Sequence, residues 1–149
     1  MKRYAVMQGP NLNRLGKRDP TRYGRTTLAE IQADLDRRAR DLNTEIAHFQ
    51  SNHEGALIDW LHEQQDREGL AGIILNPAGL TRAGWSLRTA VQDAGVPLAV
   101  VHLSELHRYG AEPEPDIFLP VANVYIAGAG WLGYRLAFEA LCTKAGELP

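Results

Sequence analysis

Short apolar runs alternate along the chain with longer segments in which apolar residues recur every three to four positions. The short runs are typical of buried strands, and the longer segments have the period of amphipathic helices. Strands are predicted at 4–8, 45–50, 72–76, 97–101 and 122–128, and helices at 26–42, 54–69, 85–95 and 131–146. This alternation predicts an α/β fold in a single domain over residues 1–149. We expect a flavodoxin-like, doubly wound, five-stranded parallel sheet of order 2-1-3-4-5.

Local signals mark the helix ends. Thr26 or Thr27 can cap the first helix, and Glu30 is placed to complete a capping box. Gly69 and Gly95 stand where the second and third helices should stop. The stretch "LGKRDPTRYG", residues 15–24, has neither a helical nor a strand period, and we predict a loop there.

Composition narrows the class of partner. The chain has a net charge of -2 with scattered Lys and Arg, which argues against nucleic acid or an acidic membrane surface as a partner. The single cysteine, Cys142, cannot form an internal disulfide and lies on the apolar stripe of the last helix, where we expect it in the core. No segment approaches the roughly 18 apolar residues of a membrane span, and no signal peptide is apparent. We expect a cytoplasmic protein that binds a small molecule.

Polar segments follow the first four predicted strands: "GPNLNRLGKRDPTRYG", "SNHEG", "NPAGLTR" and "HLSELHRYGAEPEPD". Each has a structural explanation, because Asn and Gly favour turns and Ser51 or Asn52 can cap a helix. His53 and Glu54 either brace the tyrosine loop or simply form a first helical turn. However, ligands in such sheets bind beyond the carboxyl ends of the strands, so together the segments predict a site at one rim. The five histidines show no metal-ligand spacing, and we expect no metal.

The segments "GPNLNRLG", "FQSNHEG", "NPAGLT" and "VHLS", with Arg18 five residues before Tyr23 and Gly24 after it, closely resemble the type II 3-dehydroquinate dehydratases. The resemblance is collinear over nearly the whole chain. It implies a flavodoxin-like domain that assembles into dodecamers built from trimers and needs no metal or organic cofactor. It also implies an anti elimination of water from 3-dehydroquinate through an enolate, in the shikimate pathway of aromatic amino acid biosynthesis.

The resemblance assigns roles to the rim residues. Tyr23 takes a proton from the carbon next to the ketone, and the nearby Arg18 is expected to lower the tyrosine's pKa from about 10. Gly16, Pro20 and Gly24 let this loop close as a lid. His102 is the general acid for the departing hydroxyl, and Asn11 stabilises the enolate through a bound water. The substrate-binding positions are Asn76, Gly79, Arg82, Leu103 and Ser104, with Asn76, Ser104 and the amides of Leu103 and Ser104 gripping the carboxylate.

Several positions depart from the family pattern. Arg82 replaces a histidine that contacts ring hydroxyls. Val100 replaces the glutamate that orients the general-acid histidine, so we expect His102 to lack its usual carboxylate partner. Thr89 stands in place of an aspartate that a neighbouring subunit supplies. Two arginines are replaced by Tyr109 and Pro113, and Arg108 is displaced by one position.

Three functions stay open on the sequence alone. The first is an ordinary 3-dehydroquinate dehydratase. The second is a divergent lyase that performs the same elimination, or the reverse addition, on a different β-hydroxy ketone carboxylate. The third is a catalytically silent, oligomeric binding protein. The apolar surface offered by Trp131, Leu132, the apolar face of the last helix and the Pro-rich loop exceeds what a small domain can cover alone, which favours a homo-oligomer.

Overall fold

The computed structural model describes residues 1–108, 116–146 and 148 and contains one five-stranded sheet. Its strand order is β2-β1-β3-β4-β5, and every adjacent pair is parallel. The strands are β1 (Arg3–Gln8), β2 (Glu45–Gln50), β3 (Leu70–Asn76), β4 (Leu98–His102) and β5 (Val124–Ala127). The predicted sheet and its order are confirmed.

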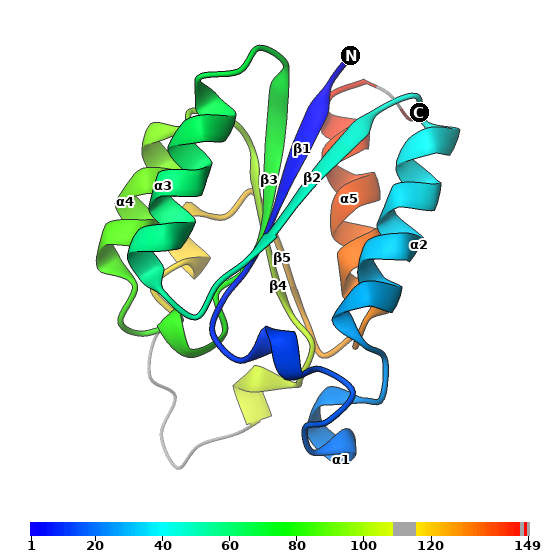
Figure 1. Cartoon of the computed structure of the whole chain (residues 1–149), viewed down its shortest axis with the longest axis vertical. Coiled ribbons are helices and arrows are strands. Elements are labelled where there is room, and N and C mark those ends of the chain that lie inside the picture. The colour runs from blue at the N-terminus through cyan, green and yellow to red at the C-terminus, as the bar shows by residue number, and fades with distance from the viewer. Residues whose placement is uncertain (109–115, 147, 149) are drawn as a thin grey trace.

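Two pairs of helices sandwich this sheet (Figure 1). The helices α2 (Leu28–Asp41) and α5 (Leu132–Lys144) cover one face, whereas α3 (Glu54–Gln65) and α4 (Trp85–Asp93) cover the other. All four correspond to predicted helices. The start of α2 is the expected capping box, because the Thr27 side chain accepts from the Glu30 amide and the Glu30 carboxylate accepts from the Thr27 amide.

The segment 15–24 is not wholly a loop as predicted, because it contains the short helix α1 (Pro20–Tyr23). Asp19 caps this helix by accepting hydrogen bonds from the amide and hydroxyl of Thr21. Proline is favourable at the first helical position, and Gly24 ends the helix with φ +73. A helix of four residues is too short to produce a detectable period, so the prediction failed here.

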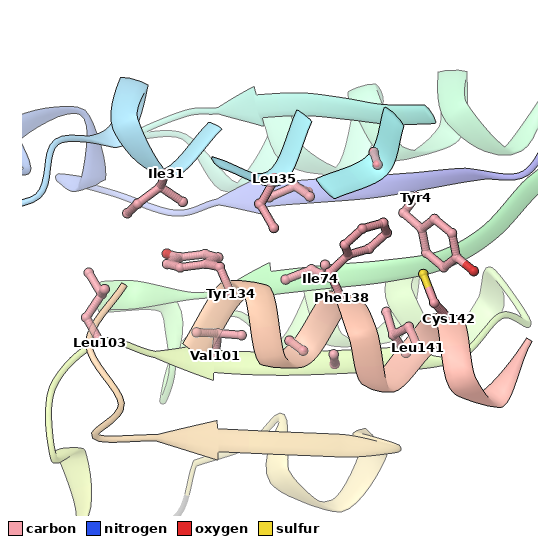
Figure 2. Close-up of a cluster of buried hydrophobic side chains, with 14 of the residues drawn as sticks. Tyr4, Ile31, Leu35, Ile74, Val101, Leu103, Tyr134, Phe138, Leu141 and Cys142 are labelled. Atoms are coloured by element: carbon pink, nitrogen blue, oxygen red, sulfur yellow. The ribbon is translucent and has the colours of Figure 1, made fainter. Parts of the chain in front are cut away.

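The core consists of two buried clusters, one on each face of the sheet. Under α2 and α5, Tyr4 and Phe138 meet edge to face with ring centroids 5.3 Å apart, and Cys142 is fully buried as predicted (Figure 2). The cluster under α3 and α4 includes Leu57 and Leu61 of α3. The three central strands, β1, β3 and β4, are therefore largely buried on both faces, which explains their runs of consecutive apolar residues.

The loops contain four short 3₁₀ helices among the described residues: η1 (Leu12–Arg14), η2 (Ala78–Leu80), η3 (Leu106–Arg108) and η4 (Leu119–Val121). The first three follow the carboxyl ends of β1, β3 and β4, at one rim of the sheet (Figure 1). Gly9 brings two of these loops together, since its amide donates to the Asn76 carbonyl at 2.9 Å. A Cβ at Gly9 would lie 2.4 Å from the Pro77 carbonyl oxygen, so only glycine fits there.

Within the described residues, none of the helices combines the length and apolar character that crossing a membrane requires.

Candidate active site

A cavity of about 210 Å³ opens at this rim. It is lined by residues from the loops after β1, β3 and β4, together with the tyrosine loop: Pro10, Asn11, Leu12, Arg18, Arg22, Tyr23, Asn76, Ala78, Gly79, Thr81, His102, Leu103, Ser104 and Leu106. Eight of the nine site residues predicted from the sequence belong to this lining, all except Arg82. The fold thus brings together segments from Pro10 to Leu106, up to 96 positions apart in the chain, as expected for a doubly wound sheet.

Two guanidinium groups lie over the ring of Tyr23. The Cζ atom of Arg18 is 3.9 Å from the ring centroid, and that of Arg22 is 5.3 Å away. Tyr23 is the last residue of α1 and packs partly against the core cluster under α2 and α5. Sequence reasoning selected Arg18 and passed over Arg22, because the turn of α1 that brings Arg22 to the same cavity was not foreseen.

Asn11 follows β1 in the left-handed region, with φ +70, a conformation that asparagine tolerates better than most residues. Its backbone amide donates to Asn52 Oδ1 at 2.9 Å, and Gln50 Nε2 donates to the same oxygen at 3.1 Å. Asn52 therefore holds the turn that presents Asn11, a role that the sequence did not reveal. Of the neighbouring residues, His53 is the N-cap of α3 and Glu54 opens its first turn, with the Glu54 carboxylate beside Gly84.

The usual glutamate is absent at position 100, as expected, but the imidazole of His102 has a different carboxylate partner, Asp116. His102 Nε2 lies 2.7 Å from Asp116 Oδ2, and the two side chains are only 5% and 6% exposed. Asp116 Oδ2 also accepts from the Tyr125 hydroxyl at 2.8 Å, and Oδ1 accepts from the Phe118 amide at 2.9 Å. The position that the sequence singled out, Val100, is fully buried and apolar.

The carboxylate comes from a segment 14 residues after His102, beyond the reach of any local spacing rule. Burial alone would raise the pKa of Asp116, but the hydrogen bonds from His102, the Phe118 amide and Tyr125 outweigh it and hold that pKa below its ordinary value. Burial, reinforced by Asp116, raises the pKa of Tyr125 far above its usual range. Asp116 is therefore the charged member of this group and Tyr125 a neutral donor.

Asn76 is held by a second buried network. Its Nδ2 donates to the Tyr134 hydroxyl at 2.9 Å, and its Oδ1 accepts from the Ala78 amide at 3.1 Å. The Tyr134 hydroxyl in turn donates to Gln8 Oε1 at 2.7 Å. Tyr134 projects from α5 toward the sheet (Figure 2), and burial keeps it neutral by raising its pKa far above the usual range. Neither Gln8 nor Tyr134 was singled out from the sequence.

The remaining departures lie away from the cavity or outside the described residues. Arg82 is exposed, and Arg108 is exposed and pairs with Glu105 at 2.6 Å. Thr89 is exposed on α4 and donates to the Trp85 carbonyl at 3.2 Å. Tyr109 and Pro113 fall outside the described residues. In the part of the chain that the structure describes, no group of three or more His, Cys, Asp or Glu side chains could hold a metal ion.

The chain resembles proteins of one known family in both sequence and structure. Residues 2–142 match the family model of class II dehydroquinases. The chain is 40% identical to the 3-dehydroquinate dehydratases of Bacillus cereus (strain AH187), over 99% of both chains, and of Bacillus subtilis (strain 168), over 98% of this chain and 97% of that one. Its structure is similar to the type II dehydroquinase from Butyrivibrio crossotus, with a TM-score of 0.88 and 31% identity over 94% of this chain and 97% of the other. The chain belongs to the class II dehydroquinase family.

Proposed function

We propose that this protein is a 3-dehydroquinate dehydratase that eliminates water in the anti sense through an enolate. The observation that carries the proposal is the convergence of a phenol, an imidazole, an amide and two guanidinium groups on one cavity. These are the groups that proton abstraction, enolate stabilisation and leaving-group protonation require. The divergent lyase and the silent binding protein are not favoured, since relatives at 40% identity over almost the full chain are 3-dehydroquinate dehydratases.

In the first step, the Tyr23 phenolate takes a proton from the carbon next to the ketone. The C–H electron pair moves toward the carbonyl oxygen and forms the enolate. Arg18 and Arg22 support this step, because their guanidinium groups lie against the ring and hold the phenol in the cavity. Asn11 stabilises the enolate oxygen through a water molecule, and its side chain is placed for this by the bond between its amide and Asn52.

In the second step, the enolate collapses and the C–O bond to the β-hydroxyl breaks. His102 gives its proton to the departing oxygen, which leaves as water, and an enone remains. The substrate carboxylate is bound by Asn76, by the Ser104 side chain and by the amides of Leu103 and Ser104. These amides lie beyond the last ladder pair of β4, His102 with Ala127. Gly79 lines the same side of the cavity, whereas Arg82 can contribute only if it swings toward the ligand.

We also propose that the protein works as a homo-oligomer, a dodecamer built from trimers, in the cytoplasm. The buried face of α5 covers the sheet, yet Trp131, Leu132 and Leu136 of the same helix region stay 37%, 38% and 43% exposed. Exposed apolar side chains in such a group support a subunit contact. The single cysteine, buried in the core, suits a reducing compartment.

The proposal is tested by incubating the purified protein with 3-dehydroquinate and following the absorbance of the enone product. Wild-type protein should form enone catalytically, and Tyr23→Phe should reduce kcat by about 10³-fold or more, since the base is lost while the ring stays. Tyr4→Phe, a matched change in the core, should keep turnover near wild type. Absence of enone with wild-type protein, or full activity of Tyr23→Phe, would refute the proposal.

A further inference from the structure

In the buried group formed by His102, Asp116 and Tyr125, the two ring nitrogens of the imidazole have different surroundings. Asp116 occupies Nε2 of the imidazole, so Nδ1 is the ring nitrogen left to act in the cavity that His102 lines. A carboxylate accepts but does not donate, so in the neutral imidazole the proton sits on Nε2. The contact therefore selects one tautomer and one ring orientation.

The other contacts of Asp116 show that it is built to remain charged. One oxygen is shared between His102 and the Tyr125 hydroxyl, and the other accepts from the Phe118 amide. These donors fix the carboxylate plane, and the ring of Tyr125 lies 5.6 Å from that of His102, centroid to centroid. A side chain 6% exposed that carries a charge and three hydrogen bonds is held in one position.

The arrangement of β4 and β5 leaves room for the Asp116 carboxylate beside His102. Val100 and His102 lie two residues apart on β4, so their side chains share one face of the sheet. In the ladder, Val100 faces Tyr125 of β5. Tyr125 thus reaches from the next strand to the carboxylate that binds His102. The residue beside it on β4, Val100, has no polar side-chain atom that could compete for this contact.

We propose that Asp116 is the positioning residue of His102: it fixes the tautomer, leaves Nδ1 as the proton-donating nitrogen, and stabilises the imidazolium before the proton is delivered to the departing hydroxyl. On transfer, the Nδ1–H bond breaks, an O–H bond forms and water leaves, while Nε2–H remains bonded to Asp116. Tyr125 and the Phe118 amide assist by holding the carboxylate. This assignment rests on the proposed dehydratase function for the identity of the leaving group, and on geometry alone for the tautomer.

Activity measurements with Asp116→Asn give the first test. The amide preserves the shape of the side chain but not its charge, so kcat should fall by about 10²-fold while KM changes little. The basic limb of the kcat profile should move to lower pH, because an amide stabilises the protonated imidazole less than a carboxylate does. Among the described residues, the other charged or titratable groups around this imidazole are Tyr125 and, across the cavity, Arg18, Arg22 and Tyr23.

Two variants separate positioning from mere packing. Asp116→Glu retains the charge and should recover part of the lost kcat. The double variant Asp116→Asn/Val100→Glu places a carboxylate on the same face of β4 as His102. It should recover part of the activity and return the basic limb of the kcat profile toward its wild-type pH. As matched control, Asp36→Asn removes the partner of another histidine, His48, whose Nε2 is also 2.7 Å from a carboxylate but lies away from the cavity; it should leave both readouts unchanged.

A second measurement does not depend on turnover. Solid-state NMR of the sedimented, ¹⁵N-histidine-labelled protein reports the tautomer of each imidazole, and the signal lost in His102→Gln identifies His102. Wild type should show a proton on Nε2 and a bare Nδ1 for the neutral ring, and Asp116→Asn should show a mixture. Unchanged kcat, pH profile and tautomer in Asp116→Asn would overturn the proposal. If wild type does not convert dehydroquinate, the proposed function fails, and the tautomer still decides the role of Asp116.

Discussion

Replacing Tyr134 by phenylalanine removes one oxygen atom from the network that holds Asn76. The ring can stay in place between α5 and the sheet, but Gln8 Oε1 loses its donor and Asn76 Nδ2 loses its acceptor. Both groups are buried, and each unpaired buried group costs about 1–3 kcal/mol. We therefore expect Tyr134→Phe to lower the free energy of unfolding by about 2–6 kcal/mol, which in a domain of this size lowers Tm by about 5–20 °C.

The same change should affect substrate binding more than chemistry. Asn76 keeps its bond from the Ala78 amide but loses the contact that fixes its NH₂ group, so its grip on the carboxylate should loosen. Calorimetry would measure Tm, and steady-state kinetics with 3-dehydroquinate would show a raised KM with a smaller change in kcat. Phe138→Leu serves as the control, because it weakens packing in the same cluster without touching the network and should leave KM unchanged. A Tm within about 2 °C of wild type together with an unchanged KM would refute this account of the network.

Two further changes probe the supports of the site and of the fold. Asn52→Ala removes the acceptor of the Asn11 amide, so kcat should fall by about 10-fold, since the turn that presents the enolate-stabilising side chain loses its anchor; equal rates for variant and wild type would count against that role. The Arg135 hydrogen bond and the charges of Arg135 and Arg37 hold the pKa of Asp34 below its ordinary 3.8 against the effect of burial, so its ionised form stabilises the fold above that pH. In chemical denaturation, the stability gap between wild type and Asp34→Asn should be full near neutral pH and narrow as the pH falls below 3.8; a gap that does not vary with pH would contradict this linkage.

The fold could be predicted because its signals are local. Apolar runs and helical periods report burial within a few residues, and the box between Thr27 and Glu30 lies within a single turn. The rim site followed from topology, since parallel strands place their carboxyl ends at one edge. The short helix α1 escaped because four residues give no period.

What the sequence could not provide was contact between distant segments. Asp116 reaches His102 from 14 positions further along the chain, Asn52 reaches the Asn11 amide from the end of another strand, and Tyr134 meets Asn76 from the last helix. No spacing rule links these pairs, because each depends on the packed sheet. The family pattern places the carboxylate only at position 100, so comparison with it gave no sign of Asp116.

The most direct test of the central claim follows the two hydrogens on the carbon that loses a proton. Samples of 3-dehydroquinate would carry deuterium at one or the other of these positions, and mass spectrometry would record which label the enone retains. If the cavity performs the anti elimination proposed here, the deuterium anti to the leaving hydroxyl is lost to solvent and the syn deuterium stays in the product. Loss of the syn label, or recovery of unreacted substrate from both samples, would contradict the account.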